Sequence, residues 1–151
     1  METWAEFAAA APTIAEAGRR LIYRSEQGSG LLSTVRGDGL PRIHPISVAI
    51  LEGRLVAVLL PSAKTNDLLE DGRYALHAHH DPAVPHEFLV RGRARRIDDE
   101  ATRARFASTW YFGVGAEDGL FDFLIDHAVL GERGSANDWP PRYSFWRSPA
   151  G

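Results

Sequence analysis

Three strand-forming stretches follow one another early in the chain and are joined by short turns. The first, Leu31–Arg36, is closed by Gly37-Asp38-Gly39, whose Asp-Gly pair suits a tight hairpin. Ile43–Leu51 is rich in β-branched residues, and the Glu52-Gly53 turn leads into the unbroken apolar run Leu55–Leu60. Strands joined by such short turns pair antiparallel, because a parallel pair needs a long crossover connection. The sequence therefore predicts an antiparallel sheet that starts early in the chain.

Further strands are predicted in the second half. Tyr74–His80 reads as one strand, and Glu87–Ile97 alternates between two faces, one of which carries the small residues Gly92 and Ala94. Small residues on an inward face suit a tight barrel interior. His127–Glu132 and Arg142–Arg147 are expected to form a last hairpin around an intervening loop.

Helical patterns separate these strands. The helices expected from apolar spacing and cap residues are one that starts at a Thr13 cap and runs past Ile22, Ala63–Glu70 after a Ser62 cap, one from Asp98/Asp99 to Ala107, and Glu117–Asp126. The order lacks the regular strand–helix–strand alternation of a parallel sheet. We therefore predict a mainly β fold, an antiparallel barrel with peripheral helices.

The 151 residues fit one domain, which we assign to 1–151. The formal net charge of -3 gives no reason to expect nucleic acid as a partner, and no apolar run is long enough to span a membrane. The sequence has no cysteine, which excludes disulfides and thiolate metal sites and suits the reducing cytoplasm.

The stretch from Pro61 to Asn66 lies where an apolar strand passes into a helix. Free backbone N–H groups and the helix dipole favour an anion at such a place, and Ser62, Lys64 and Asn66 add polar side chains. This arrangement suits a phosphate group. An ordinary capped helix with a solvated lysine is the alternative.

A second candidate is the strand around Pro41 and Pro45. Proline removes a ladder donor, so this stretch is expected at a sheet edge or beside a ligand or partner chain. Exposed backbone groups there can bind the edge of a planar heterocycle. An ordinary edge strand explains the same residues equally well.

Residues 15–98 resemble the pyridoxamine 5'-phosphate oxidase-like family of FMN-binding split barrels, which includes relatives that use the deazaflavin F420. The residues that carry the resemblance are Gly39-x-Pro41-x-x-His44-Pro45-Ile46, Ser62-x-Lys64-x-Asn66-x-Leu68, and Gly92 followed by Asp98. The resemblance implies a six-stranded antiparallel split barrel that forms a homodimer and holds FMN at the subunit interface.

The family pattern also implies roles for particular residues. The flavin ring and ribityl chain would contact His44, Pro45, Ile46, Ser47, Val58 and Leu59. Lys64, with Ser62 and Asn66, would hold the phosphate, and Trp146 and Arg147 are candidates for contacts from the partner subunit. Ala63 replaces an arginine that many members carry, and no arginine-rich C-terminal segment is visible, so oxidation of vitamin B6 is not expected.

The resemblance favours an enzyme, a flavin-dependent oxidoreductase that transfers a hydride to or from a small organic substrate. No catalytic acid or base is required by such chemistry, and His44 is a candidate proton donor. An F420-dependent reductase and a non-enzymatic flavin- or haem-binding protein remain alternatives. Several histidines lie between His77 and His86, but strand geometry brings at most two of them together, so no metal site is assigned.

The row Arg91, Arg93, Arg95 and Arg96 is a further feature with more than one interpretation. Acidic residues follow it at once and no aromatic residues interleave with it, which favours a solvated or dimer-facing strand over a nucleic-acid site. The same row is able to neutralise an anionic cofactor tail, such as that of F420.

Overall fold

A computed structural model describes residues 1–150 of the chain. Its elements, in chain order, are α1 (Trp4–Ala10), α2 (Pro12–Ile22), β1 (Gly28–Val35), β2 (Pro41–Leu51), β3 (Arg54–Leu59), α3 (Ala63–Glu70), β4 (Arg73–Ala78), β5 (Glu87–Arg96), α4 (Glu100–Thr109), β6 (Gly119–Glu132) and β7 (Arg142–Arg147). None of the helices within this described part has the length and apolarity needed to cross a membrane.

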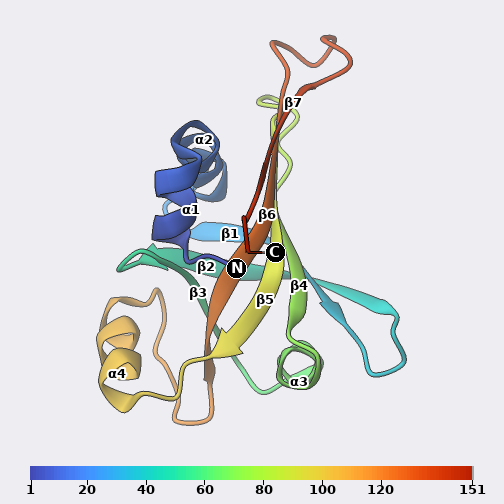
Figure 1. Ribbon diagram of the computed structural model, residues 1–151. Helices are drawn as coiled ribbons and strands as arrows, with labels where there is room; N and C mark the ends of the chain where they lie inside the picture. The colour runs from blue at the N-terminus through green and yellow to red at the C-terminus, as the bar shows by residue number, and fades with distance from the viewer. Residues whose placement is uncertain (151) are drawn as a thin grey trace.

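The strands form an antiparallel sheet in the order β3-β2-β1-β4-β5-β6-β7. β3 also pairs with β6, which closes the first six strands into a barrel and confirms the predicted fold class. The C-terminal half of β6 continues beyond the barrel and pairs with β7, so these two strands form a projecting arm (Figure 1). α1 and α2 lie on the arm side, whereas α3 and α4 lie towards the opposite end.

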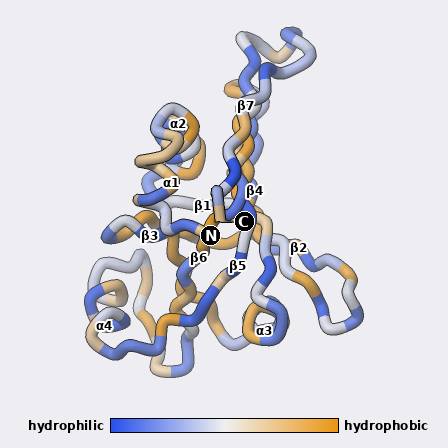
Figure 2. Tube along the Cα trace, viewed as in Figure 1, coloured by the Kyte–Doolittle hydropathy of each residue, from blue (hydrophilic) through white to orange (hydrophobic). Residues whose placement is uncertain are grey.

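The core fills the barrel and extends under the first two helices. Figure 2 shows hydrophobic residues along β6 and the neighbouring strands. Phe7 of α1 and Ile22 of α2 are fully buried against barrel residues such as Phe88. A smaller cluster under α4 joins Phe106 to Val56 and to its neighbours on the outer side of the barrel. β3 is therefore covered on both faces, which explains its unbroken apolar sequence.

Gly92 marks a place where the barrel needs a small residue. The β5–β6 register shifts between Arg91 and Gly92, and a Cβ built on Gly92 would lie only 2.0 Å from the Leu124 carbonyl oxygen. The prediction that small residues of β5 face the barrel interior is correct. The reason is a bulge at which the backbones of β5 and β6 approach each other closely.

Two local predictions are wrong. Residues 117–126 do not form a helix, and the strand β6 begins at Gly119 instead. The first residues of β6 are buried on both faces, so their apolar side chains also fit helical spacing. Thr13 does not cap α2, because that helix begins one residue earlier, with Pro12 in its first turn and Ala11 at the cap position. The separate helix α1 was not predicted, although Thr3 and Glu6 form a complete capping box.

Candidate functional site

The barrel opens between β2 and β3. Their ladder ends at the pair Ala49 and Val56, although both strands continue. In the same register Val48 would pair with Ala57, and after it Ser47, Ile46 and Pro45 would pair with Val58, Leu59 and Leu60. The last six of these residues instead separate and line a cavity of about 210 Å³. β2 remains bound to β1 and β3 to β6, so the opening is confined to one seam of the barrel.

The backbone of β2 presents polar groups to this opening. Hydrogen-bonding groups alternate between the two sides of a strand. The Val48 carbonyl and the Ile50 N–H bond the hydroxyls of Tyr111 and Tyr23 on the β1 side. Residues 45 and 47 therefore direct their backbone groups towards the opening. Pro45 has no N–H to leave unpaired, which fits its place at an unpaired edge.

Aromatic residues after α4 form another wall of the cavity. Trp110, Phe112 and Gly113 line it, together with Asp118 just before β6. The Tyr111 hydroxyl bridges the Gly28 N–H and the Val48 carbonyl, and this bridge ties the segment to the ends of β1 and β2. The cavity thus lies between strand edges and an anchored aromatic segment.

Lys64 lines the same cavity from the first turn of α3. Ser62 stands at the N-cap position as predicted, but its side chain makes no capping bond and contacts the Thr65 hydroxyl at 3.2 Å. Thr65 in turn donates to the Leu60 carbonyl at 2.8 Å. The first turn of α3 therefore carries a lysine and no side-chain cap, which is favourable for an anion.

A buried ionic network fixes α3 against the hairpin of β1 and β2. Asp67 accepts hydrogen bonds from the Thr34 hydroxyl at 2.7 Å and from Arg42 Nε at 2.8 Å, and its side chain is only 7% exposed. Burial raises the pKa of Asp67, but these two bonds and the charges of Arg42 and Arg36 together outweigh it and hold the pKa below the ordinary value of 3.8. The network therefore sets where Lys64 lies relative to β2.

Part of the predicted site is brought together at this cavity. The predicted residues that line it are Pro45, Ile46, Ser47, Val58, Leu59 and Lys64. His44, Ser62 and Asn66 do not line it. Trp146 packs towards the core, with its ring 5.0 Å from that of Phe7.

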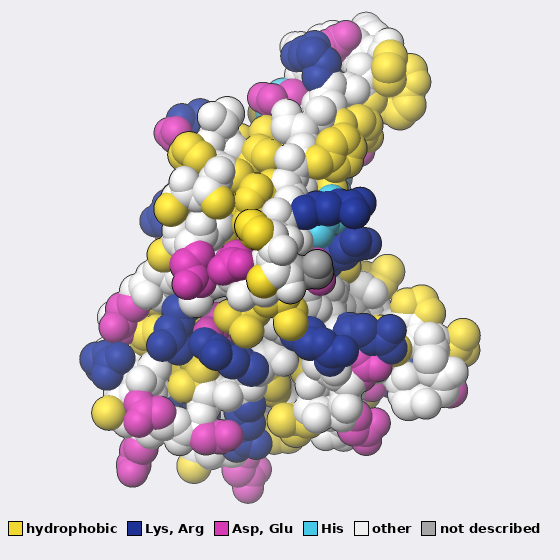
Figure 3. All heavy atoms as spheres, in the orientation of Figure 1, with side chains coloured by type: hydrophobic (Ala, Val, Ile, Leu, Met, Phe, Trp, Pro, Cys, Tyr) yellow, Lys and Arg dark blue, Asp and Glu magenta, His cyan; other side chains and the backbone are white. Residues whose placement is uncertain are grey.

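Arg147 lies in a different recess, at the base of the arm. It lines this recess with Arg91, Asp126, His127 and Ser148. Figure 3 shows Lys or Arg side chains gathered beside a histidine on this face. Burial, followed by the nearby Arg91 and Arg147 charges, lowers the pKa of His127. The recess is separate from the cavity between β2 and β3.

Sequence analysis missed the aromatic wall. The run Trp110-Tyr111-Phe112 was its only available signal, and the mistaken helix over 117–126 concealed Asp118 as a loop residue. A carboxylate at this position opposes a negatively charged ligand. It is therefore the one lining residue whose charge conflicts with a phosphate held at Lys64.

The arginine row of β5 is already paired with partners in the chain. Arg91 lies 3.7 Å from Asp126, Arg95 lies 3.0 Å from Asp122, and Arg96 lies 2.8 Å from Asp98. Arg93 donates to the Asp71 carbonyl at 2.7 Å. These contacts favour the interpretation as a solvated strand. Among residues 1–150 no three histidine or acidic side chains are placed to hold a metal.

The sequence profile of the pyridoxamine 5'-phosphate oxidase family matches residues 16–128 of this chain. This span includes β1 to β5 and most of the cavity lining. The chain therefore belongs to the pyridoxamine 5'-phosphate oxidase family. A search of curated proteins finds no significant match.

Solved structures share the fold at low sequence identity. A haem-binding protein from Mycobacterium smegmatis aligns with a TM-score of 0.64 and 18% identity over 87% of this chain. The chain spans only 57% of that protein. General stress protein 26 from Bacillus anthracis aligns with a TM-score of 0.62 and 19% identity, covering 88% of this chain and 97% of the other.

A protein related to general stress protein 26, from Clostridium acetobutylicum, gives a TM-score of 0.67 with 12% identity. It covers 90% of this chain and 94% of its own. At these identities the likeness establishes the fold alone.

Proposed function

We propose that the protein is a flavin-dependent oxidoreductase that binds FMN in the cavity between β2 and β3. The observation that carries this proposal is that Lys64, in the first turn of α3, lines the same cavity as the separated strand edges, and that this turn has no side-chain cap. A planar ring needs a slot with edge-on polar groups, and its phosphate needs a cation and free N–H groups. Lys64 and the separated strand edges at this seam suit both requirements, and the family is named for an oxidase.

The residues present fit such a cofactor. Pro45 and Ser47 would place their backbone groups along the ring edge, and Val58 and Leu59 would contact its apolar part from β3. Trp110 and Phe112 would limit the access of water. FMN supplies hydride chemistry when bound, so the chain itself needs to bind, orient and shield it, and no acid or base is required.

We also propose that the functional unit is a homodimer. The cavity is smaller than the roughly 300–1,000 Å³ typical of cofactor sites, so a flavin would extend beyond it. Residues that are paired across neighbouring strands form one uncovered row of side chains on the outer face of the sheet. In order, they are Phe145, Val129, Leu89, His77, Leu31 and Pro45. This row ends at the cavity wall, so a second copy packed on it would lie beside the flavin.

The exposure of this row supports a partner there. Phe145 is 64% exposed and Leu31 is 38% exposed, although both are large apolar side chains. Leu31→Asp is expected to convert the dimer into a monomer in size-exclusion chromatography with light scattering, because a carboxylate would be buried without a partner. Leu69→Asp, at an exposed leucine of α3, is the control. A monomeric wild-type protein would refute the dimer.

The cofactor is tested by titrating the purified protein with FMN, F420 and haemin and recording visible spectra. Saturable FMN binding at one per subunit is expected. Lys64→Ala should weaken FMN by about 1.5–3 kcal/mol, the range for a charge-assisted hydrogen bond, and leave riboflavin unchanged because it lacks the phosphate. Equal FMN affinity in the variant would show that the phosphate lies elsewhere.

The other titrations decide between the alternatives. Selective binding of F420 would redirect the proposal to a deazaflavin reductase. A Soret band with haemin would favour a haem-binding protein, the kind of protein that the Mycobacterium smegmatis neighbour is named for. With bound FMN established, oxidation of NAD(P)H with dye acceptors would distinguish turnover from storage.

A further inference from the structure

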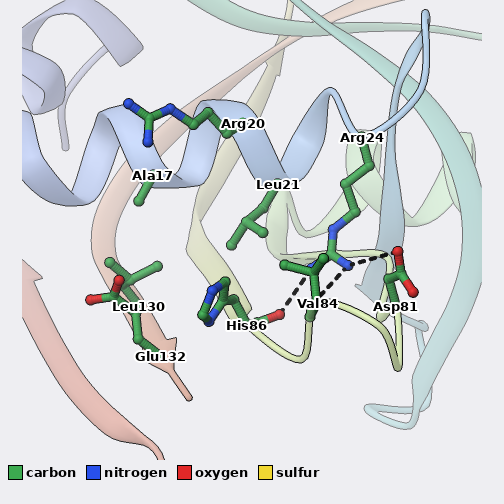
Figure 4. A pocket seen from close by; sticks show the side chains of 9 residues that line it. All are labelled: Ala17, Arg20, Leu21, Arg24, Asp81, Val84, His86, Leu130 and Glu132. Atoms are coloured by element: carbon green, nitrogen blue, oxygen red, sulfur yellow. Dashed lines mark hydrogen bonds and ion pairs between the residues drawn. The ribbon is translucent and has the colours of Figure 1, made fainter. Parts of the chain in front are cut away.

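A second cavity, of about 360 Å³, lies between α2, the β4–β5 loop and the arm (Figure 4). It shares no lining residue with the cavity between β2 and β3. Ala17, Leu21, Val84 and Leu130 supply its apolar lining. The α2 residues that line it run from Ala17 to Leu21, which corresponds to about 6 Å along a helix. Its length and apolar lining suit a flat ring system.

Arg24 holds the wall of this cavity in place. Its guanidinium donates to the Val84 carbonyl at 3.2 Å and to the His86 carbonyl at 3.0 Å, and it lies 3.9 Å from Asp81. These contacts, drawn as dashed lines in Figure 4, join the β4–β5 loop to the segment that follows α2. Arg24 is balanced by Asp81, and Arg20, which also lines the cavity, is bonded to Glu16 at 2.6 Å, so each of these two cations already has a carboxylate partner in the chain.

His86 offers a hydrogen-bond donor to the cavity. The Arg133 backbone N–H donates to His86 Nδ1 at 3.2 Å, so the proton of the neutral ring is on Nε2. Within residues 1–150, Nε2 has no hydrogen-bond partner. It is also not a buried atom, so a ligand in the cavity can reach it. A ligand in the cavity is therefore expected to present an acceptor to it.

Glu132 offers an acceptor beside this donor. The β5–β6 ladder begins at the pair Glu87 and Gly131, and one further step in register places His86 opposite Glu132. Directly opposed residues have Cβ atoms about 4.5–5.5 Å apart. Both side chains line the cavity, and Figure 4 draws both below α2. The two residues thus offer one donor and one anionic acceptor to the same cavity.

We propose that this second cavity binds a flat aromatic molecule that carries a carboxamide or a cyclic amide. The amide carbonyl accepts from His86 Nε2, the amide N–H donates to the Glu132 carboxylate, and the ring lies between Leu21 and Leu130. A carboxylate in place of the amide is disfavoured, because it offers no donor and meets the like charge of Glu132. The proposal is independent of the flavin site.

Calorimetric titration of the full chain with 2-naphthamide and 2-naphthoate tests the proposal, since the two probes differ only in the head group. The amide is expected to bind one per chain and at least about fivefold more tightly than the carboxylate. The reason is the repulsion between the carboxylates of 2-naphthoate and Glu132 at about 5 Å. Glu132→Gln should remove most of this preference by strengthening 2-naphthoate. His86→Phe should weaken the amide about fivefold, the loss of one hydrogen bond.

Ala17→Trp, which fills the cavity from α2, should abolish binding of both probes, and thermal unfolding will establish that this variant is folded. Lys64→Ala, at the other cavity, should leave 2-naphthamide affinity unchanged. The proposal is overturned if 2-naphthamide does not bind, if folded Ala17→Trp still binds it, or if Glu132→Gln leaves the preference between the probes as it was.

Discussion

Asp67→Asn tests whether the buried network under α3 stabilises the fold and positions the proposed phosphate site. The wild-type carboxylate accepts from Thr34 and Arg42, and hydrogen bonds to charged groups contribute about 1.5–3 kcal/mol each. Asparagine retains one neutral acceptor, and the Arg42 side chain, 30% exposed, recovers part of its bond from water. We therefore expect a loss of about 2–3 kcal/mol in the free energy of unfolding.

The assay is urea unfolding followed by tryptophan fluorescence, with thermal unfolding beside it. A loss of this size corresponds to a melting temperature lower by about 5–10 °C for a chain of this length. Asp71→Asn is the matched control, because the Asp71–Arg73 pair is equally short but exposed to solvent. It should change stability little. A loss below about 0.5 kcal/mol for Asp67→Asn, the lower limit for a single hydrogen bond, would refute the reasoning.

The same network predicts a pH dependence. The pKa of Asp67 lies below its unfolded value of 3.8 in the folded protein, so its carboxylate stabilises the fold above that pH. This contribution is lost as the pH falls through the folded-state pKa. The stability difference between wild type and Asp67→Asn should therefore be constant from pH 5 to 7 and shrink below about pH 4. Other acids cancel in this difference, and a constant difference down to pH 2 would contradict the assignment.

Three further predictions concern other parts of the molecule. Gly92→Ala should prevent stable folding, because its Cβ would collide with the Leu124 backbone of β6, and circular dichroism on the purified variant checks this. Asp118→Asn should tighten FMN binding about two- to fivefold, because it removes a negative charge from the cavity proposed to hold the negatively charged phosphate at Lys64. Riboflavin affinity should not change, and titration with both ligands checks this. Trp146→Ala should lower the free energy of unfolding by about 2–3 kcal/mol, because the Trp146 ring packs on Phe7. It should not change the oligomeric state; urea unfolding measures the first effect and light scattering the second.

Local patterns carried most of the fold assignment. The turns after Arg36 and Leu51, the prolines of β2 and the alternation of β5 all act over a few residues, and the predicted strands appear at those places. β6 was misread because one of its ends is buried on both faces. An apolar run of that kind has no period that separates strand from helix.

The position of Lys64 at a helix start was predictable to a similar degree. Lys64 follows a buried strand and begins a helix, and both features are local. Pro45 likewise signalled an unpaired edge. The family resemblance added Val58 and Leu59, which do line the cavity, and Trp146, which packs into the core instead. Side-chain direction near the chain end depends on the partner strand, so a motif cannot specify it.

The sequence by itself determined an antiparallel, mainly β chain with an anion-favouring helix start, because turns, alternation and caps are short-range effects. Tertiary structure alone decided that β3 pairs with β6, that β2 and β3 separate beyond Ala49, and that the segment around Trp110 covers the opening. It also placed His86 and Glu132 on the wall of one cavity. These contacts join residues far apart in the chain, and their free energy depends on closing the whole barrel, which no local pattern encodes.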